Sequence, residues 1–361
     1  MKTVLVGVGQ AGGKLTTALT QFDEQMGFGA VLDALAVNSA TADLQPLPLD
    51  TILIGQDRVK GHGVGGDNEL GAEIMQQDIG EVLGALSGRI TAHAESIIVV
   101  AGLGGGTGSG GAPVVVNQLS RIYDVPVYAL GVLPGRDEGT LAQVNAGRSL
   151  KTLVGHADST ILIDNDAWKS SGESLSDGYE AINTNIARRI GLLLGAGEAT
   201  HGVGESVVDT SEVINTLRSG GVAAIGYATA PAADDPADNI TTVMSAARNS
   251  LLTGLSLPGA TKADAALLVI AGSPEKLSRK GVEKARRWVE TETGSMQVRG
   301  GDFPIESDNI AALTVVSGVE RSDRVERFLN RARQASREQA AEPATPIADK
   351  HFQNDDLDGL F

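Results

Sequence analysis

The fold is decided by the stretch SIIVVAGLGGGTGSGGAPVVVNQL, Ser96 to Leu119. An apolar run typical of a buried strand leads directly into a glycine-rich loop, Gly104–Gly110, and an apolar helical stretch follows. Glycines let backbone N–H groups close around an anion, and a helix start adds the positive end of its dipole. Thr107 and Ser109 offer hydroxyls to the same anion. A flexible linker would not stand between a buried strand and a helix, so this stretch predicts a phosphate-binding loop.

Two further glycine clusters favour a nucleoside triphosphate as the ligand. The run Gly7–Gly13 formally matches G-x-G-x-x-G, but a dinucleotide site would need an acidic residue where Asn38 and Ser39 end the next strand. The cluster Gly61–Glu69 is either a third ligand loop or a surface loop, and His62 in it is equally consistent with an ordinary exposed residue. The sequence contains no G-x-x-x-x-G-K-[ST], so backbone amides, helix dipoles and a metal ion must offset the phosphate charge.

The first half of the chain alternates apolar runs with amphipathic stretches, which predicts an α/β, Rossmann-like domain with a mainly parallel sheet. In such sheets ligands bind beyond the carboxyl ends of the strands, where the glycine loops would stand. The strands expected are Thr3–Val8, Ala34–Asn38, Ser96–Ala101, Val127–Leu133 and Thr160–Ile163.

The second half predicts a long central helix followed by a smaller α+β domain. Apolar residues recur every three or four positions over Gly178–Gly195, the spacing of one amphipathic helix. We therefore expect a nucleotide-binding domain at 1–177, a linking helix at 178–197, a second domain at 198–320, and a solvated terminal helix with a disordered acidic tail at 321–361. The further elements expected are strands Ala223–Tyr227, Ala265–Ala271 and Ala311–Ser317, and helices Val213–Leu217, Ile240–Thr253 and Pro274–Thr293.

Composition excludes several classes of protein. With no cysteine among 361 residues, the chain cannot form disulfides, Cys-ligated zinc sites or thiol nucleophiles. A net charge of −16 repels nucleic acid and anionic membranes, so neither is an expected partner, and the acid excess suits a protein kept soluble in high salt. We find no convincing signal peptide or membrane span, and so expect a cytoplasmic protein.

Several motifs together resemble the tubulin/FtsZ superfamily, and within it most of all the archaeal CetZ group. They are GQAGGK, AVNSA, GHGVGGDNELGAE, LGGGTGSGGAPV, LPGRDEG and VRGGDFPI, spread over roughly residues 1 to 320. The resemblance implies a cytoskeletal GTPase that binds GTP or GDP, with Mg²⁺ held through nucleotide phosphates and water rather than by a protein ligand set. It also implies that the chain associates with itself head to tail, so that one subunit completes the site of the next.

The resemblance carries the nucleotide-binding residues over to this chain. It gives Glu138 the role of the ribose-contacting acid, Asn165 and Asn183 the guanine edge, and Tyr179 the stacking ring. Tyr179 and Asn183 would share one helix face; spacing alone favours a core tyrosine, and the resemblance favours the stacking role. The residues implied to bind the nucleotide are Gln10, Ala11, Gly12, Gly13, Lys14, Asn38, Gly65, Gly66, Asp67, Gly104, Gly105, Gly106, Thr107, Gly108, Glu138, Asn165, Tyr179 and Asn183.

The run Asp209-Thr210-Ser211-Glu212 has two interpretations. Taken alone, it is a helix capping box. By the resemblance, Asp209 and Glu212 are the catalytic acids that enter the nucleotide site of the neighbouring subunit. The chain departs from FtsZ where Val207 replaces an asparagine and Ala142 replaces an arginine.

Three functional hypotheses therefore stay open. The first is a GTPase filament protein that controls cell shape, with FtsZ-type cell division as its variant. The second is a nucleotide-gated structural or adaptor protein with little hydrolysis, and the third is an NAD(P)-dependent oxidoreductase that would use the Gly7–Gly12 loop. The acidic end Asp355–Phe361 is either a docking motif for a protein partner or a solvated terminus.

Overall fold

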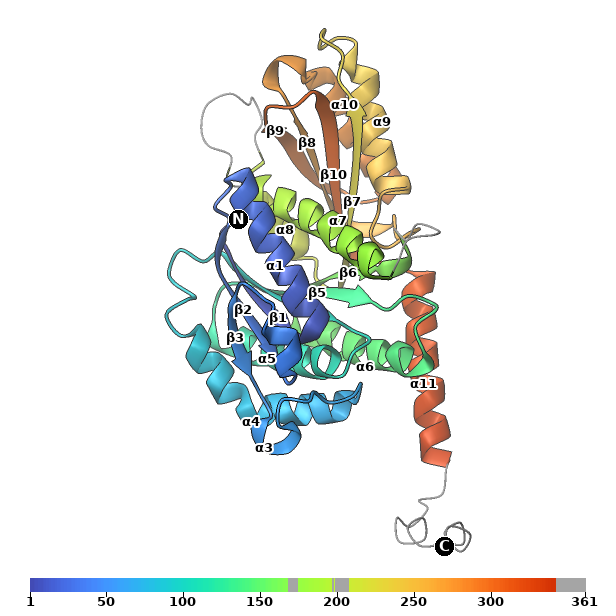
Figure 1. The fold of residues 1–361 in the computed structure, drawn as a ribbon. Helices are drawn as coiled ribbons and strands as arrows, with labels where there is room; N and C mark the ends of the chain where they lie inside the picture. Colours follow the sequence, from blue (N-terminus) through green and yellow to red (C-terminus); the bar gives the residue numbers. More distant parts are fainter. Residues whose placement is uncertain (168–174, 197, 199–207, 342–361) are drawn as a thin grey trace, which may run out of the picture.

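The architecture is one twisted sheet of ten strands with helices on both faces (Figure 1). The computed structural model describes residues 1–167, 175–196, 198 and 208–341. The strand order is β3-β2-β1-β4-β5-β6-β7-β10-β8-β9. Neighbouring strands are parallel from β3 to β7, whereas β10 runs antiparallel to both β7 and β8. The predicted fold class is confirmed: a mainly parallel α/β half is followed by a mixed half.

All eight predicted strands are present, and two more were missed. The missed strands are β3, a four-residue edge strand with two exposed residues, and β9, which carries Gly300 and Gly301. Neither has the alternating or continuous apolar pattern by which strands are recognised. The strands are β1 Thr3–Val8, β2 Val31–Asn38, β3 Asp50–Leu53, β4 Ser96–Gly102, β5 Val127–Leu133, β6 Ser159–Asp164, β7 Val222–Pro231, β8 Ala263–Gly272, β9 Gln297–Pro304 and β10 Asn309–Val319.

The helices fill the connections between these strands. Glycine ends two of them: Gly27 follows α1 and Gly294 follows α10, and both have the positive φ that glycine adopts without strain. The helices are α1 Gly9–Met26, α2 Thr41–Leu44, α3 Gln56–Val59, α4 Asn68–Leu86, α5 Thr107–Ile122, α6 Thr140–His156, α7 Leu175–Ala196, α8 Thr210–Leu217, α9 Asn239–Leu252, α10 Arg279–Thr293 and α11 Asp323–Ala341, with single 3₁₀ turns at Asn165–Ala167 and Pro274–Lys276.

The two faces of the sheet have separate cores, because successive strand side chains point to opposite sides. In β1, Val4, Val6 and Val8 pack toward α4 and α5, whereas Leu5 packs on the other face with residues of α1, α7 and α8. Figure 1 shows α7 lying across the join between the two halves of the molecule. Two residue pairs link β6 to β7 at that join, and buried apolar residues of α7 share one core with Leu5 of the first half and Ile225 of the second.

The terminal helix α11 differs from the solvated helix that the sequence predicts. It packs against α6, and Figure 1 shows the two helices side by side. Phe328 and Ala332 are buried, and Arg324 is only 5% exposed. The prediction was wrong because arginines dominate the sequence of this helix. Only two buried apolar residues, spaced i and i+4, dock it, and so short an apolar pattern is not recognised in the sequence. The predicted disordered tail lies outside the described residues.

The contact between α11 and α6 gives a stability prediction. At Gly147 of α6, an added Cβ would lie 2.5 Å from the Cβ of Ala332 and 2.8 Å from the carbonyl oxygen of Phe328. We expect Gly147→Ala to lower the free energy of unfolding by about 1–3 kcal/mol, because two helix backbones must separate. Gly155→Ala, on the same helix with open space around it, is the matched control and should be neutral or slightly stabilising. Urea unfolding of both variants checks this, and equal stabilities would contradict it.

Candidate nucleotide-binding site

The carboxyl ends of the parallel strands meet at one edge of the sheet and open into a cavity of about 520 Å³. The register sets this edge: Val8 pairs with both Val37 and Ala101, and Gly102 pairs with Val132. The volume lies within the range of small-molecule and cofactor sites. The predicted residues that line it are Gln10, Ala11, Lys14, Asn38, Gly65, Gly66, Gly104, Gly105, Gly106, Thr107, Gly108, Glu138, Asn165 and Asn183.

The start of α1 and the start of α5 touch at this edge. An added Cβ on Gly9 would lie 2.7 Å from the amide nitrogen of Gly108, and one on Gly108 would lie 2.8 Å from the carbonyl oxygen of Gly102. Gly9 also has φ +74°, where other residues are strained. The glycines are therefore needed so that two backbone loops can approach each other beneath the cavity.

The cavity can hold an anion mainly through backbone groups. Neither α1 nor α5 has a side-chain cap, so their first N–H groups remain available, and each helix start carries partial positive charge. Lys14 is the one lysine or arginine among the described residues that line the cavity. Ala142, where FtsZ has arginine, packs beside Gly104, since a Cβ on that glycine would lie 3.1 Å from the Ala142 Cβ. This arrangement suits phosphates that are partly neutralised by a divalent cation.

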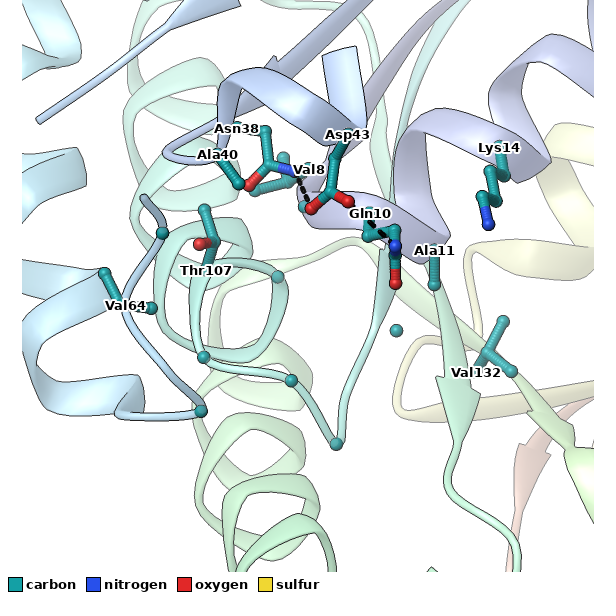
Figure 2. Close-up of a pocket in the computed structure, with 18 of the residues that line it drawn as sticks. Val8, Gln10, Ala11, Lys14, Asn38, Ala40, Asp43, Val64, Thr107 and Val132 are labelled. Atoms are coloured by element: carbon teal, nitrogen blue, oxygen red, sulfur yellow. Dashed lines mark hydrogen bonds between the residues drawn. The ribbon is translucent and has the colours of Figure 1, made fainter. Parts of the chain in front are cut away.

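Asp43 organises the amides on one side of the cavity, a role that the sequence does not predict. Its carboxylate accepts hydrogen bonds from Gln10 Nε2 at 2.8 Å and from Asn38 Nδ2 at 3.0 Å. Figure 2 shows both amides turned toward the Asp43 carboxylate. The hydroxyls of Ser39 and Thr107, 2.7 Å apart, tie the same loop to the start of α5. A lone aspartate within a short polar helix carries no signal of this role in the sequence.

The third glycine cluster also reaches the cavity, so it is more than a surface loop. Gly65, Gly66 and the exposed His62 line the cavity. Asp67 does not line it: its carboxylate caps α4 by accepting from the amides of Glu69 and Leu70, each at 3.0 Å. Asp67 thus fixes the end of the loop rather than facing the cavity.

Two implied contacts, Gly12 and Gly13, lie behind the cavity wall. Both glycines are buried, and a Cβ on Gly12 would lie 2.3 Å from the carbonyl oxygen of Val100 in β4. On Gly13 it would lie 2.7 Å from the side chain of Leu47. In this structure their place is to let α1 pack closely against its neighbours.

The opposite side of the cavity holds the remaining predicted residues. Glu138 and Asn165 line it from two loops, and Asn183 lines it from α7. Glu138 Oε1 accepts a hydrogen bond from the Gly135 amide at 2.7 Å. Tyr179 is in α7, one turn before Asn183, as predicted, and its side chain lies outside the described part of the chain.

The side-chain amide of Asn145 in α6, whose role the sequence does not predict, supports the glycine loops from behind the cavity. Asn145 is fully buried, and its Nδ2 donates to the carbonyl oxygens of Gly66 at 2.8 Å and Gly104 at 3.1 Å. It therefore joins the third glycine cluster to the main phosphate-type loop. An asparagine inside an amphipathic helix gives no local sign of such a role.

Comparison with known proteins assigns the family. Residues 2–173 match the family model of the tubulin/FtsZ GTPase domain, and residues 172–334 match that of the tubulin-like CetZ C-terminal domain. The tubulin-like protein CetZ2 of Haloferax volcanii is 67% identical over 361 residues, which cover 100% of both chains. The chain belongs to the CetZ family of tubulin-like proteins.

Two solved structures of CetZ proteins have the same fold. One, CetZ2 from Haloferax volcanii as a GTPγS-bound protofilament, superposes with a TM-score of 0.91 at 67% identity and covers 94% of this chain and 100% of that one. The other, CetZ1 from Haloferax volcanii as a GDP-bound monomer, gives a TM-score of 0.87 at 46% identity, with coverage of 93% and 100%.

In this CetZ chain, Asp209 and Glu212 form the capping box at the start of α8. Asp209 Oδ1 accepts from the Glu212 amide at 3.0 Å and from the Ser211 hydroxyl at 2.6 Å, and Glu212 Oε2 accepts from the Asp209 amide at 3.3 Å. The hydrogen bonds that the Asp209 carboxylate accepts, from the Ser211 hydroxyl first and then from the Glu212 amide, hold the pKa of Asp209 below its ordinary value. Val207 lies outside the described residues.

The capping box lies at the opposite edge of the sheet from the cavity. The hydroxyl of Thr210 donates to Glu95 at 3.2 Å, directly before β4 begins, and the same carboxylate accepts from the Lys2 amide directly before β1. The cavity lies at the other ends of these strands. The length of β4 puts the two about 20 Å apart at ~3.3 Å per residue, so the acids cannot reach the cavity of their own chain.

Within the described parts of the chain, no helix combines the length and the apolar character that a membrane span requires.

Proposed function

We propose that this CetZ-family chain binds GTP in the cavity, polymerises head to tail, and hydrolyses GTP where Asp209 and Glu212 of one subunit enter the cavity of the next. The observation that carries the proposal is the separation of the cavity and the acids to opposite edges of one sheet. A chain built in this way needs a second copy to complete its site, and head-to-tail contacts of that kind can generate open filaments. The CetZ2 protofilament with bound GTPγS is consistent with this arrangement.

In this proposal the chain supplies mainly position and charge. The amides at the starts of α1 and α5 bind phosphate oxygens, and Lys14 adds a positive charge at the rim. Asn165, Asn183 and Tyr179 bind the base, and Glu138 binds the ribose. Mg²⁺, held through phosphates and water, would neutralise charge on the β- and γ-phosphates. Glu212 of the next subunit orients the attacking water and accepts its proton, with Asp209 beside it, which is sufficient protein chemistry for phosphoryl transfer.

The biological part of the proposal is control of cell shape by such filaments in the cytoplasm, as expected from the resemblance to the CetZ group. A partner that binds the acidic tail would connect the filaments to other components. Cells that lack the protein should then divide normally but fail to change shape. A division defect would instead favour the FtsZ-type role.

The concentration dependence of hydrolysis tests the molecular part directly. We expect GTP turnover per molecule to rise steeply with protein concentration, because a monomer has only half of a site. The assay should be run at high ionic strength, since a net charge of −16 on each subunit opposes stacking around an anionic nucleotide until salt screens it. Phosphate release and electron microscopy on the same samples give the measurement.

Two outcomes would contradict this proposal in different ways. Turnover per molecule that does not depend on concentration would place the whole site within one chain. Filaments that form with GTP but release no phosphate would instead support the nucleotide-gated structural protein. GDP in place of GTP is the control for nucleotide-dependent assembly.

A further inference from the structure

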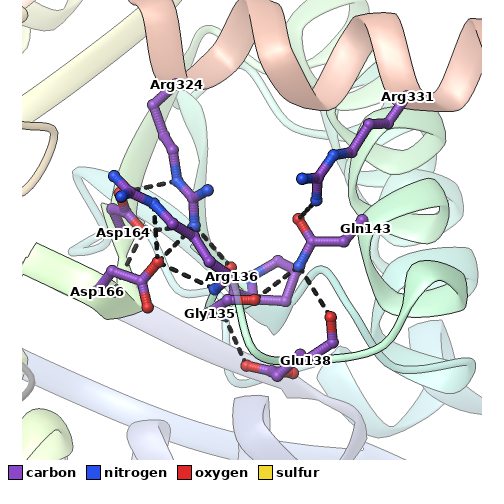
Figure 3. Close-up of polar contacts among 9 residues, drawn as sticks. Gly135, Arg136, Glu138, Gln143, Asp164, Asp166, Arg324 and Arg331 are labelled. Carbon is purple, nitrogen blue, oxygen red and sulfur yellow. Dashed lines mark hydrogen bonds and ion pairs between the residues drawn. The ribbon is translucent and has the colours of Figure 1, made fainter.

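Arg324, near the start of α11, binds Asp164 and Asp166 (Figure 3), the residues on either side of the cavity-lining Asn165. Its Nε donates to Asp164 Oδ2 at 2.9 Å, and its Nη2 donates to Asp164 Oδ1 at 3.1 Å and to Asp166 Oδ2 at 3.0 Å. Nη2 also donates to the carbonyl oxygen of Pro134 at 3.1 Å. The side chains of Arg324 and Asp164 are only 6% and 4% exposed. One buried guanidinium therefore fixes the residues on both sides of a cavity-lining asparagine.

Arg331, two helical turns further along α11, contacts the 134–138 loop indirectly, through Gln143. Its Nη1 donates to Gln143 Oε1 at 3.1 Å. The Nε2 of the same amide donates to the carbonyl oxygens of Gly135 at 2.6 Å and Glu138 at 3.4 Å. Because Arg331 occupies the amide oxygen, the NH₂ group must face the 134–138 loop, which presents Glu138 to the cavity.

The two loops are also joined to each other. The backbone amide of Arg136 donates to Asp166 Oδ2 at 2.9 Å, the oxygen that Arg324 also binds. Phe328 lies between the two arginines in sequence and is buried. The guanidinium carbon of Arg324 lies 4.5 Å from the centroid of the Phe328 ring. The 134–138 loop, the 164–166 turn and α11 therefore form one connected unit, which is complete only when α11 is docked.

We propose that α11 positions the base and ribose side of the nucleotide cavity, with Arg324 and Arg331 as its two positioning residues. This inference rests on the proposed function, in which the cavity binds GTP. Neither arginine lines the cavity, so both act through other residues. Arg324 fixes the turn that carries Asn165 and so supports the preference for guanine. Arg331, through Gln143, fixes the loop of Glu138 and so supports affinity for any nucleoside triphosphate.

The two arginines can be distinguished by measuring affinities for two nucleotides on the full chain. For Arg324→Lys, which keeps the charge but loses the planar fork, we expect GTPγS to bind about 10-fold more weakly and the preference for GTPγS over ATPγS to fall. For Arg331→Ala, we expect both nucleotides to bind more weakly by a similar factor, with the preference unchanged. Isothermal titration calorimetry gives both dissociation constants.

Arg333→Ala is the matched control. Arg333 lies on the same helix, is exposed, and donates to Asn330 of α11 itself, so its removal should change neither affinity. Arg331 is also exposed, so Arg331→Ala folds even if Arg324→Lys does not, and thermal unfolding of all variants reports stability separately. Hydrogen exchange of the backbone amides of residues 135–138 should increase in Arg331→Ala and stay unchanged in Arg333→Ala.

Affinities and preference equal to wild type in folded Arg331→Ala and Arg324→Lys would overturn the inference, as would a loss of stability with no change in binding. If wild type and Arg333→Ala bind GTPγS alike and only Arg324→Lys and Arg331→Ala bind it more weakly, the inference holds. A wild-type chain that binds neither nucleotide would instead overturn the proposed function, and this inference with it.

Discussion

Glu212→Gln should lower GTP turnover in assembled protein by about 10²–10⁴-fold while GTP affinity stays within about twofold, because in the proposed function the lost group acts as a base in the neighbouring site. Glutamine is suited to this test. It can occupy the same place in a capping box, where the Glu212 side chain accepts from the Asp209 amide, so the start of α8 keeps its hydrogen bond. The substitution therefore removes the acid and keeps the cap. Phosphate release at saturating protein, with GTP affinity from equilibrium binding, gives both values.

Glu290→Gln, on an exposed surface of α10, is the control for the loss of one negative charge from each subunit. It should match wild type in turnover and in assembly. Normal turnover in filaments of Glu212→Gln would show that Glu212 only caps α8, as its sequence pattern alone suggests. A large loss of GTP binding would place Glu212 within the site of its own chain, against the 20 Å separation estimated from the length of β4.

The cavity could be foreseen from the sequence because its parts are local. Each phosphate-type loop is a strand, a few glycines and a helix start in immediate succession, as in Ser96–Leu119. Parallel pairing then brings the strand ends to one edge without further information, since Val8 lies beside both Val37 and Ala101. Local pattern and a general rule of parallel sheets were sufficient for this part of the site.

The groups that hold the loops in place could not be foreseen, because their partners are distant in sequence. Arg324 binds carboxylates 158 and 160 residues earlier, and nothing in the charged run from Glu320 separates it from its exposed neighbours. Asp43 and Asn145 are likewise ordinary polar residues until the fold brings their partners to them. A sequence pattern identifies what faces a ligand more readily than what supports it from behind.

The sequence also left two interpretations of the capping box: the structure shows the cap, and the catalytic role is part of the proposed function. Asp209 uses Oδ1 for the cap, and the box lies at an exposed start of α8 at the far edge of the sheet. A cap holds two carboxylates in fixed positions at a surface. Such a surface is what a catalytic pair that enters another subunit requires.

The second large effect is expected at the contact between the loops beneath the cavity. Gly108→Ala should weaken GTP binding by about 5- to 150-fold, and assembly should fail with it. An added Cβ at Gly108 would lie 2.8 Å from the carbonyl oxygen of Gly102 and 3.1 Å from that of Val8. Both are backbone atoms at strand ends, so the backbone itself would have to shift to make room. The strain of overpacking is about 1–3 kcal/mol, and at 1.4 kcal/mol per factor of ten it corresponds to that range of affinity.

Gly84→Ala separates this local effect from the general effect of replacing a glycine in a helix. Gly84 is exposed on α4 with open space around its Cα, so the alanine should stabilise the chain by up to about 1 kcal/mol and leave GTP binding unchanged. Calorimetric titration with GTP and thermal unfolding of both variants provide the measurement. If Gly108→Ala binds GTP as wild type does, the starts of α1 and α5 are not held in the close approach on which the anion site depends. The phosphates would then have to be bound by side chains, and in the described wall of the cavity the one permanent cation for that purpose is Lys14.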